Sequence, residues 1–152
     1  MAMEATPYLS AEIAHLNPSE LTRGYWDACR RHELSIQRCT ACGQFQHPPK
    51  PICGRCRTFD LEFAPTSGRG KVFTFIVVHH PVHPALQPNL PYNVALVELE
   101  DAPGVRIVSN VVDTPPEEIQ VGMPVEVAWE EPHPGTVLPR FRRREVSEES
   151  RG

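Results

Sequence analysis

The chain has 152 residues, which suffices for one ordinary domain or two very small ones and excludes a large multidomain enzyme. Lys and Arg total 15 against 19 Asp and Glu, and a formal charge of -4 argues against a protein that coats duplex nucleic acid. A hydrophobic fraction of 40% permits a modest core, and 17 prolines argue against a bundle of long helices.

The charges are unevenly distributed along the chain. Residues 23–71 carry nine Lys or Arg and four Asp or Glu. Residues 72–139 carry only one Lys or Arg but nine Asp or Glu. A basic first half joined to an acidic second half predicts two units with different roles. The amino terminus lacks a basic stretch followed by an apolar run, and the most apolar run, 72–78, is too short to cross a bilayer. We therefore expect a cytoplasmic protein that spans no membrane.

The amino-terminal part is predicted to contain an arm and one helix. Residues 1–17 show no clean periodicity and are expected to form a flexible arm. Apolar residues then recur every four positions, which predicts a helix within 18–33. On this helix we expect Tyr25 and Trp26 to be exposed, as suits a docking surface, and Cys29 to pack against the rest of the protein.

Residues 34–67 are predicted to form a zinc ribbon. Two Cys-x-x-Cys pairs, Cys39 with Cys42 and Cys53 with Cys56, are separated by ten residues, and each pair brings two sulfurs to one metal at a tight turn. Four thiolates suit Zn²⁺ and would also suit iron. Because four protein ligands leave no open coordination position, the metal is expected to be structural. Reduced thiols in this spacing fit the cytoplasm better than a disulfide framework does.

The remainder is predicted to be a five-stranded barrel of the OB type over residues 68–144. A glycine-rich joint precedes five short segments rich in Val, Ile, Phe and Tyr and bounded by turn residues, at 71–80, 92–100, 105–112, 125–130 and 138–143. Short antiparallel strands of this number are typical of the OB fold. Residues 145–152 are expected to be a flexible tail. The predicted fold class is mainly β, with an N-terminal helix, a zinc ribbon and an OB barrel.

The sequence offers little evidence for catalysis. It contains no nucleophile and base at a recognisable spacing, so no catalytic residue is predicted. His79, His80 and His83 lie in a Pro-rich loop at the expected barrel rim, and His133 lies in a similar turn. Histidines in such loops are more often solvated than catalytic.

A basic stripe is predicted on the last strand. It consists of the residues around Phe141, namely Arg140, Arg142, Arg143 and Arg144. The pattern fits an edge strand protected by charge and equally fits a site for a phosphate-bearing ligand.

Several motifs in order resemble a known family. They are Tyr25-Trp26-Asp27-Ala28-Cys29, the two cysteine pairs with Gly43, His47-Pro48-Pro49, Gly68-Arg69-Gly70, Val77-Val78-His79-His80, Pro91-Tyr92 and Val121-Gly122-Met123-Pro124-Val125. Over about residues 18–143 the chain resembles the OB-fold acyl-CoA-associated proteins with an amino-terminal rubredoxin-like zinc ribbon, long filed as a domain-of-unknown-function family. This ordered run is far more specific than the cysteine spacing alone.

The resemblance implies an accessory subunit that is not itself a catalyst. Members of the family partner thiolase-superfamily enzymes, namely thiolases, steroid side-chain aldolases and acyltransferases, as hetero-oligomers. It implies that the chain helps to bind or channel an acyl-CoA and that Cys39, Cys42, Cys53 and Cys56 are metal ligands. It assigns no individual residue that contacts CoA.

Two alternative functions remain open. Zinc ribbons and OB barrels also bind single-stranded nucleic acid, although the acidic barrel argues against a groove that follows a phosphate backbone, so we expect no nucleic-acid partner. A free-standing acyl-CoA enzyme, such as a thioesterase or hydratase, would have to use the loop of His79, His80 and His83. Activity of the isolated chain would favour that second alternative.

Overall fold

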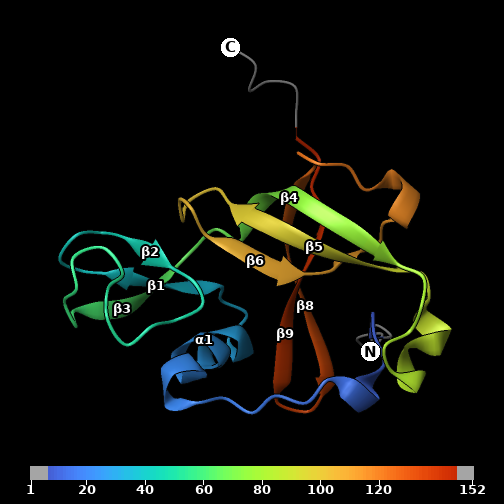
Figure 1. Ribbon diagram of the computed structural model, residues 1–152, viewed down its shortest axis with the longest axis horizontal. Coiled ribbons are helices and arrows are strands. Elements are labelled where there is room, and N and C mark those ends of the chain that lie inside the picture. The colour runs from blue at the N-terminus through green and yellow to red at the C-terminus, as the bar shows by residue number, and fades with distance from the viewer. Residues whose placement is uncertain (1–6, 147–152) are drawn as a thin grey trace.

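A computed structural model describes residues 7–146 and contains two β-sheets and one α-helix (Figure 1). The small sheet has the order β2-β1-β3 and the large sheet the order β6-β5-β4-β8-β9-β7. The small-sheet strands are β1 (Ser35–Cys39), β2 (Phe45–Gln46) and β3 (Leu61–Pro65). The large-sheet strands are β4 (Arg69–Val78), β5 (Tyr92–Leu99), β6 (Arg106–Ser109), β7 (Val111–Val112), β8 (Pro124–His133) and β9 (Thr136–Arg143). The mainly β fold class predicted from the sequence is confirmed.

The helix α1 (Glu20–Arg30) packs on the ribbon and the barrel. Ser19 caps it, because its side chain accepts a hydrogen bond from the backbone N–H of Thr22. Gly24 faces β3 so closely that a Cβ there would lie 2.5 Å from the ring of Phe63. This close approach explains a glycine inside a helix, where it costs about 1 kcal/mol relative to alanine. Three 3₁₀ turns complete the structure, η1 (Ala11–Ile13), η2 (Pro84–Asn89) and η3 (Pro116–Glu118).

The barrel closes through a strand that changes partners. The segment predicted as one strand over 105–112 is divided at Asn110, so that β6 pairs with β5 and β7 runs parallel to β9. Asn110 is buried and uses its side chain for bonds to the carbonyl of Asn93 and to Arg140, while its own carbonyl accepts from the N–H of Phe141. These bonds turn the chain from one strand pairing to the other.

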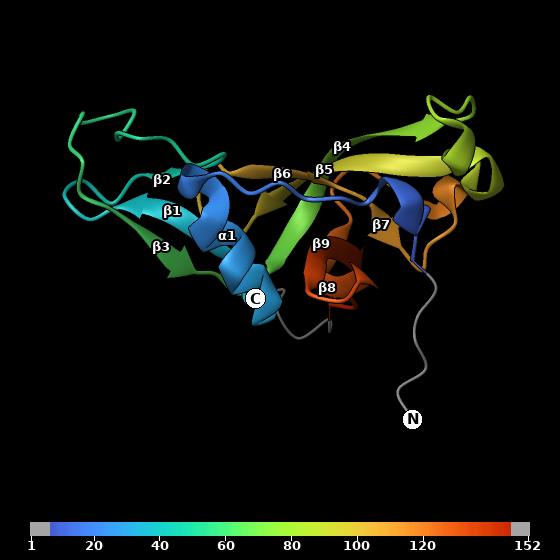
Figure 2. The ribbon, with the colours of Figure 1, turned by 90° about the horizontal axis from the view of Figure 1, so that it is seen from below.

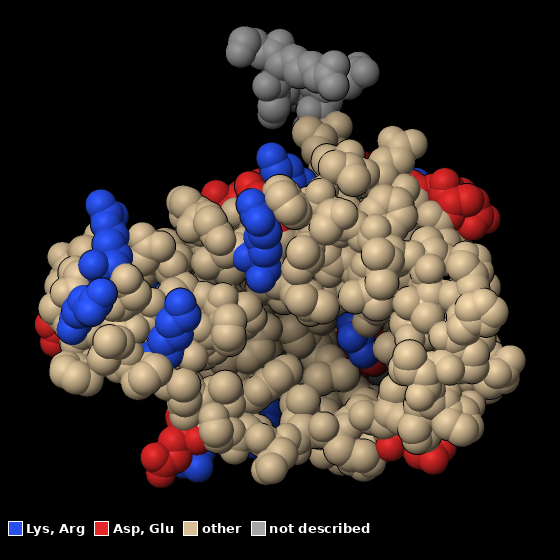
Figure 3. Space-filling view, in the orientation of Figure 1, with Lys and Arg blue, Asp and Glu red and all other residues tan. Residues whose placement is uncertain are grey.

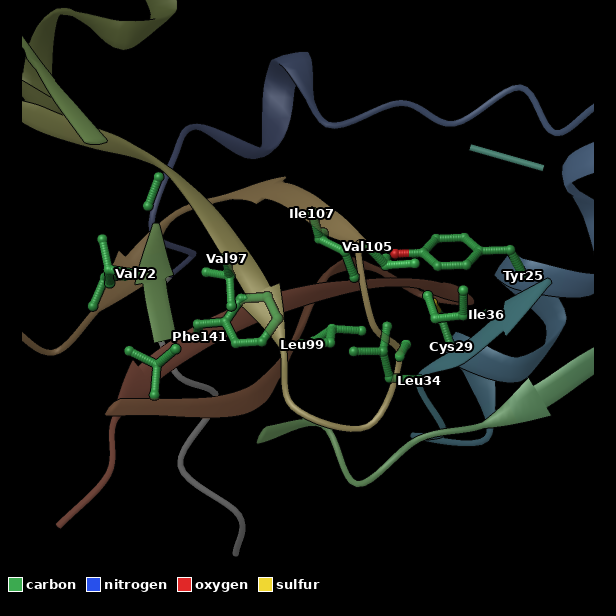
Figure 4. Packing of buried hydrophobic residues seen from close by; sticks show 14 of the residues in the cluster. Tyr25, Cys29, Leu34, Ile36, Val72, Val97, Leu99, Val105, Ile107 and Phe141 are labelled. Atoms are coloured by element: carbon green, nitrogen blue, oxygen red, sulfur yellow. The ribbon is translucent and has the colours of Figure 1, made fainter. Parts of the chain in front are cut away.

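One hydrophobic core connects the helix, the ribbon and the barrel (Figure 4). Cys29 on α1 and Ile36 on β1 are fully buried, in the same cluster as Val97 and Phe141 of the barrel. Tyr25 is only 5% exposed, so the expectation that it is exposed was wrong. The periodicity of α1 identified an apolar face, but that face packs inward and takes Tyr25 with it. Cys29 packs as expected, and Trp26 is half-buried.

The amino-terminal segment lies along the barrel in its described part, residues 7–17 (Figure 2). The hydroxyl of Tyr8 accepts bonds from the backbone N–H and the side-chain amide of Asn93, at 3.1 and 2.7 Å. Its backbone N–H donates to Glu130, and its carbonyl accepts from Asn89. A segment expected to be a flexible arm therefore makes specific contacts far along the chain. Residues 1–6 and 147–152, which include most of the predicted tail, lie outside the described residues.

Among the described residues, α1 and the short turns fall short of the length and apolar character that a membrane-spanning helix needs.

Candidate metal centre and the surrounding surfaces

Two tight turns bring the four predicted ligand cysteines together at one end of the ribbon. The four Sγ atoms all lie within 4.8 Å of one another, with 3.5 Å between Cys39 and Cys56 and 3.6 Å between Cys42 and Cys53. Sulfurs placed about 2.3 Å from a tetrahedral Zn²⁺ would be separated by about 3.8 Å. The arrangement of the thiols therefore fits a four-coordinate Zn²⁺.

The two turns have the same backbone design. After the first pair, Gly43 has a φ of 77° and donates its N–H to the carbonyl of Cys39 at 2.8 Å. After the second pair, Arg57 has a φ of 63° and donates to the carbonyl of Cys53 at 3.1 Å. This left-handed conformation favours glycine, so the turn at Arg57 is the more strained of the two.

Hydrogen bonds to the sulfurs of Cys39 and Cys53 favour the thiolate form that binds metal, whereas desolvation and the neighbouring thiols raise the pKa of Cys42 to about 11. The Thr58 hydroxyl lies 3.4 Å from Sγ of Cys39 and 3.3 Å from Sγ of Cys56. This hydroxyl, together with backbone amides of the turn, lowers the pKa of Cys39. The backbone amides of Cys56 and Arg55 likewise lower the pKa of Cys53.

Two buried glutamines hold the second cysteine turn in place, and the sequence analysis did not identify them. Gln46 donates to Gln37 Oε1 at 2.7 Å and accepts from the N–H of Gly54 at 3.1 Å. Gln37 exchanges hydrogen bonds with the backbone of Lys50, accepting at 2.8 Å and donating at 3.0 Å. Polar residues at inward positions of short strands beside the cysteines were the available signal.

Replacing Gln46 with Leu is expected to lower the zinc affinity of the chain by about 10- to 100-fold, the usual cost of losing a group that orients metal ligands. The N–H of Gly54 would lose its acceptor, and the turn that carries Cys53 would become less ordered. Competition with a chromogenic chelator measures the effect. Gln44→Leu is the matched control, because the Gln44 side chain donates only to the neighbouring carbonyl of Phe45 among the described contacts. Equal affinities of the two variants would contradict the assigned role.

His47 couples the ribbon to α1 and makes stability depend on pH. Its ring centre lies 5.2 Å from that of Tyr25, and burial lowers its pKa from the ordinary value of 6.5. The unfolded chain therefore binds a proton at a higher pH than the folded chain does. Between pH 6.5 and the lowered folded pKa, the free energy of unfolding should fall as the pH falls, by up to about 1.4 kcal/mol per pH unit.

Urea unfolding of the wild type and of His47→Gln at pH 7.5 and 5.5 tests this dependence. The His47→Gln variant should show a smaller slope than the wild type, because the zinc-bound thiolates contribute the remainder. His80→Gln, at an exposed position, should keep it. The same slope in all three proteins would mean that His47 does not cause the effect.

The histidine loop does not form a site in this structure. His79, His80 and His83 are all exposed, and the only group of metal-ligating side chains found among the described residues is the four cysteines. His83 accepts from the N–H of Ala85 and so caps η2. His133 stacks instead on His15, with 4.8 Å between ring centres.

The predicted basic stripe is paired with acids. The pairs are Arg140 with Glu130, Arg142 with Glu126, Arg143 with Glu118 and Arg144 with Glu100. This pairing argues against a phosphate site, and the edge-strand interpretation was wrong, because β9 lies between β8 and β7 and pairs with both. The Arg140–Glu130 pair is the least exposed, at 14% and 11%.

The outer face of β4, β5 and β6 is apolar and partly open to solvent. On it, Phe73, Ile76 and Val108 are 39%, 62% and 68% exposed. The strand register places Ile76 beside Val94, and Arg106 covers the Phe73 ring at 3.6 Å. Few charged side chains lie on this side of the molecule over these strands (Figure 3). We call these five residues the outer sheet face.

Comparison with known proteins identifies the family. Residues 26–62 match the ChsH2 rubredoxin-like zinc ribbon domain, and residues 64–130 match the ChsH2 C-terminal OB-fold domain. A DUF35 domain-containing scaffold protein of Methanocaldococcus jannaschii is 40% identical over 116 residues, which cover 75% of this chain and 79% of that protein. The chain belongs to the DUF35 family. The family resemblance noted in the sequence is thereby confirmed for this DUF35 chain.

Longer relatives contain a similar region. The "Probable enoyl-CoA hydratase alpha subunit" of Thermomonospora curvata is 44% identical over 126 residues, 83% of this chain and 38% of that protein. The "3-oxo-4,17-pregnadiene-20-carboxyl-CoA hydratase alpha subunit" of Mycobacterium tuberculosis is 38% identical over 108 residues, 71% of this chain and 33% of that protein. This DUF35 chain thus spans well under half the length of these two relatives.

Among solved structures, a chain of the "Ltp2-ChsH2(DUF35) aldolase" is similar with a TM-score of 0.77 and 41% identity. The match covers 85% of this chain and 98% of that chain. The two chains therefore share one fold over most of their length.

Proposed function

We propose that this DUF35 chain is an accessory subunit that docks on a thiolase-superfamily enzyme and has no catalytic activity of its own. The partner would be a thiolase, a steroid side-chain aldolase or an acyltransferase. The observation that carries the proposal is the similarity to nearly the whole of one chain, 98%, of the "Ltp2-ChsH2(DUF35) aldolase". The exposure of His79, His80 and His83 to solvent supports a non-catalytic role.

Within this subunit, Cys39, Cys42, Cys53 and Cys56 would hold one structural Zn²⁺. Their sulfur separations and hydrogen bonds support this assignment. A Zn²⁺ ion supplies four bonds that fix the two turns of the ribbon, where buried apolar side chains are few. The ribbon would extend over residues 34–67 and the OB domain over 68–144.

The outer sheet face would be the surface that contacts the partner enzyme. It is the part of the barrel where large apolar side chains meet solvent in adjacent strands, and such faces commonly mark protein–protein contacts. Four of its five residues are apolar, which suits the buried centre of an interface, and Arg106 is paired with Glu98. In the assembled complex the chain would help to bind or channel an acyl-CoA, as the CoA thioesters in the names of the hydratase relatives suggest.

Charged substitutions on the outer sheet face test the docking. The variants Ile76→Asp and Val108→Asp should each weaken partner binding at least about 30-fold, because an uncompensated charge at an interface costs about 2 kcal/mol or more. Val82→Asp is the matched control, since Val82 is 86% exposed and lies outside the sheet. The chain is first isolated with its partner from native cells, and affinities are then measured with the purified partner.

If Ile76→Asp and Val108→Asp bind the partner with unchanged affinity, the docking surface does not include the outer sheet face. Nucleic acid in place of an enzyme partner would contradict the proposed function. Turnover of CoA thioesters by the isolated chain, abolished by alanine at His79, His80 and His83, would also contradict it.

A further inference from the structure

Two adjacent hollows lie beneath the amino-terminal segment, on the outer side of β9. The first, of about 220 Å³, is lined by Leu138 and Arg140 of β9 and by six residues of the segment, Leu9, Ser10, Ile13, Ala14, His15 and Leu16. The surface is visibly hollowed at the position of β9 (Figure 3). The lining is largely apolar, with the Arg140 guanidinium as its one charged group.

The second hollow, of about 210 Å³, continues toward α1. Its lining includes Trp26 and Arg30 of α1, Val137 of β9 and Leu16, which also lines the first hollow. Leu16 therefore borders both hollows. Each hollow alone is smaller than the roughly 300–1,000 Å³ of ordinary ligand sites, whereas the two joined would fall within that range.

We propose that the two hollows form one binding site for an elongated, uncharged molecule that has an apolar chain and one hydroxyl or carbonyl oxygen. Leu16 would turn aside to let the chain pass from the first hollow into the second. The oxygen would lie at Arg140, and the far end of the chain would lie against Trp26. This inference is independent of the proposed partner enzyme.

The state of Arg140 determines the preference for an uncharged ligand. Its two terminal nitrogens donate to Asn110 at 2.6 Å and to Glu130 at 3.2 Å, while its Nε is buried with no protein acceptor. That nitrogen is out of a ligand's reach, but each terminal nitrogen carries a second N–H, from which a ligand oxygen in the first hollow can accept a hydrogen bond. Because Glu130 already neutralises Arg140, a carboxylate would add an unbalanced negative charge beside Glu130. A cationic ligand would meet both Arg140 and Arg30.

The walls of the site can move, since the segment that covers it is held at a few points. Tyr8 anchors one end through Asn93 and Glu130. His133 contacts the carbonyl of Ala11 at 2.5 Å and stacks on His15. Between these anchors and α1, Leu16 is joined to the barrel by packing rather than by a hydrogen bond in the described contacts.

The test titrates the full zinc-loaded chain, with ¹³C-labelled Leu and Ile methyl groups, with three eight-carbon probes. 2-Octanone should shift the methyl signals of Ile13, Leu16 and Leu138. Octanoate and octylammonium should bind at least about tenfold more weakly than 2-octanone. Equal binding of the three probes, or shifts confined to other methyl groups, would overturn the proposal.

Substitutions at Leu16 distinguish a built site from casual binding. Leu16→Trp fills the passage and should weaken 2-octanone binding at least about tenfold, whereas Leu16→Ala opens the passage and should strengthen it. Val82→Trp, in the exposed loop after β4, is the control and should leave the affinity unchanged. Zinc content and melting temperature verify that each variant is folded. If neither Leu16 variant changes the affinity for 2-octanone, the binding is that of an adventitious additive only.

Discussion

Replacing Cys39 and Cys56 together with Ser is expected to abolish zinc binding and to unfold the ribbon. The two sulfurs lie 3.5 Å apart and come from different turns, so the double variant removes one ligand from each. Apparent binding free energies of structural zinc are about 10–16 kcal/mol, which is comparable to the entire stability of a small domain. No other change of two side chains in the described ribbon should have so large an effect.

The loss of zinc should also destabilise the barrel, because the ribbon and the barrel share one hydrophobic core. Leu34 and Ile36 of the ribbon belong to the same cluster as Leu99 and Phe141 of the barrel. An unfolded ribbon would expose that side of the cluster, so we expect the barrel to melt at a lower temperature as well. Metal analysis and thermal melting by circular dichroism measure the two effects separately.

Cys29→Ala provides the control for the cysteine variant. Cys29 is buried on α1 outside the metal cluster, so this variant should keep one zinc per chain and lose only packing energy. A double Ser variant that still binds one zinc, or that melts at the wild-type temperature, would contradict the structural role of the metal.

Phe141→Ala should destabilise the barrel by about 3–5 kcal/mol, the usual cost of removing a fully buried aromatic side chain. Phe141 is 0% exposed, pairs with Val111 at the barrel closure and lies opposite Val127 on β8. Its removal leaves a cavity where three strands meet. For a chain of this size the melting temperature should fall by roughly 10 °C.

Phe59→Ala is the matched control, because Phe59 is 79% exposed in the ribbon. It should change the free energy of unfolding by less than about 0.5 kcal/mol. Urea unfolding at pH 7.5 gives both values. Similar losses in the two variants would show that the core is not centred where Phe141 lies.

The elements of the fold could be predicted because their signals are local. The spacing of the four cysteines predicts two turns without reference to the rest of the chain. Alternating Val, Ile and Phe residues likewise predict the strands, although they do not show which strands pair. The ordered motifs from Tyr25 to Val125 then indicated the family, which the ribbon and OB-fold matches confirm.

The remaining features depend on contacts between distant residues. The sequence could not show that Tyr8 meets Asn93, 85 positions away, or that Asn110 divides a strand because its side chain bonds to Arg140. The same limit explains the error at Tyr25. Periodicity identifies an apolar face of a helix, but whether a tyrosine on that face is covered depends on the ribbon that packs against it.

The central proposal, an accessory subunit of a thiolase-superfamily enzyme, is tested most directly by native mass spectrometry of the tagged chain purified from its own cells. We predict a complex with a thiolase-like protein in a fixed ratio, with one zinc ion in each DUF35 chain. A chain that emerges alone under conditions that preserve complexes, or that carries nucleic acid, would contradict the proposal.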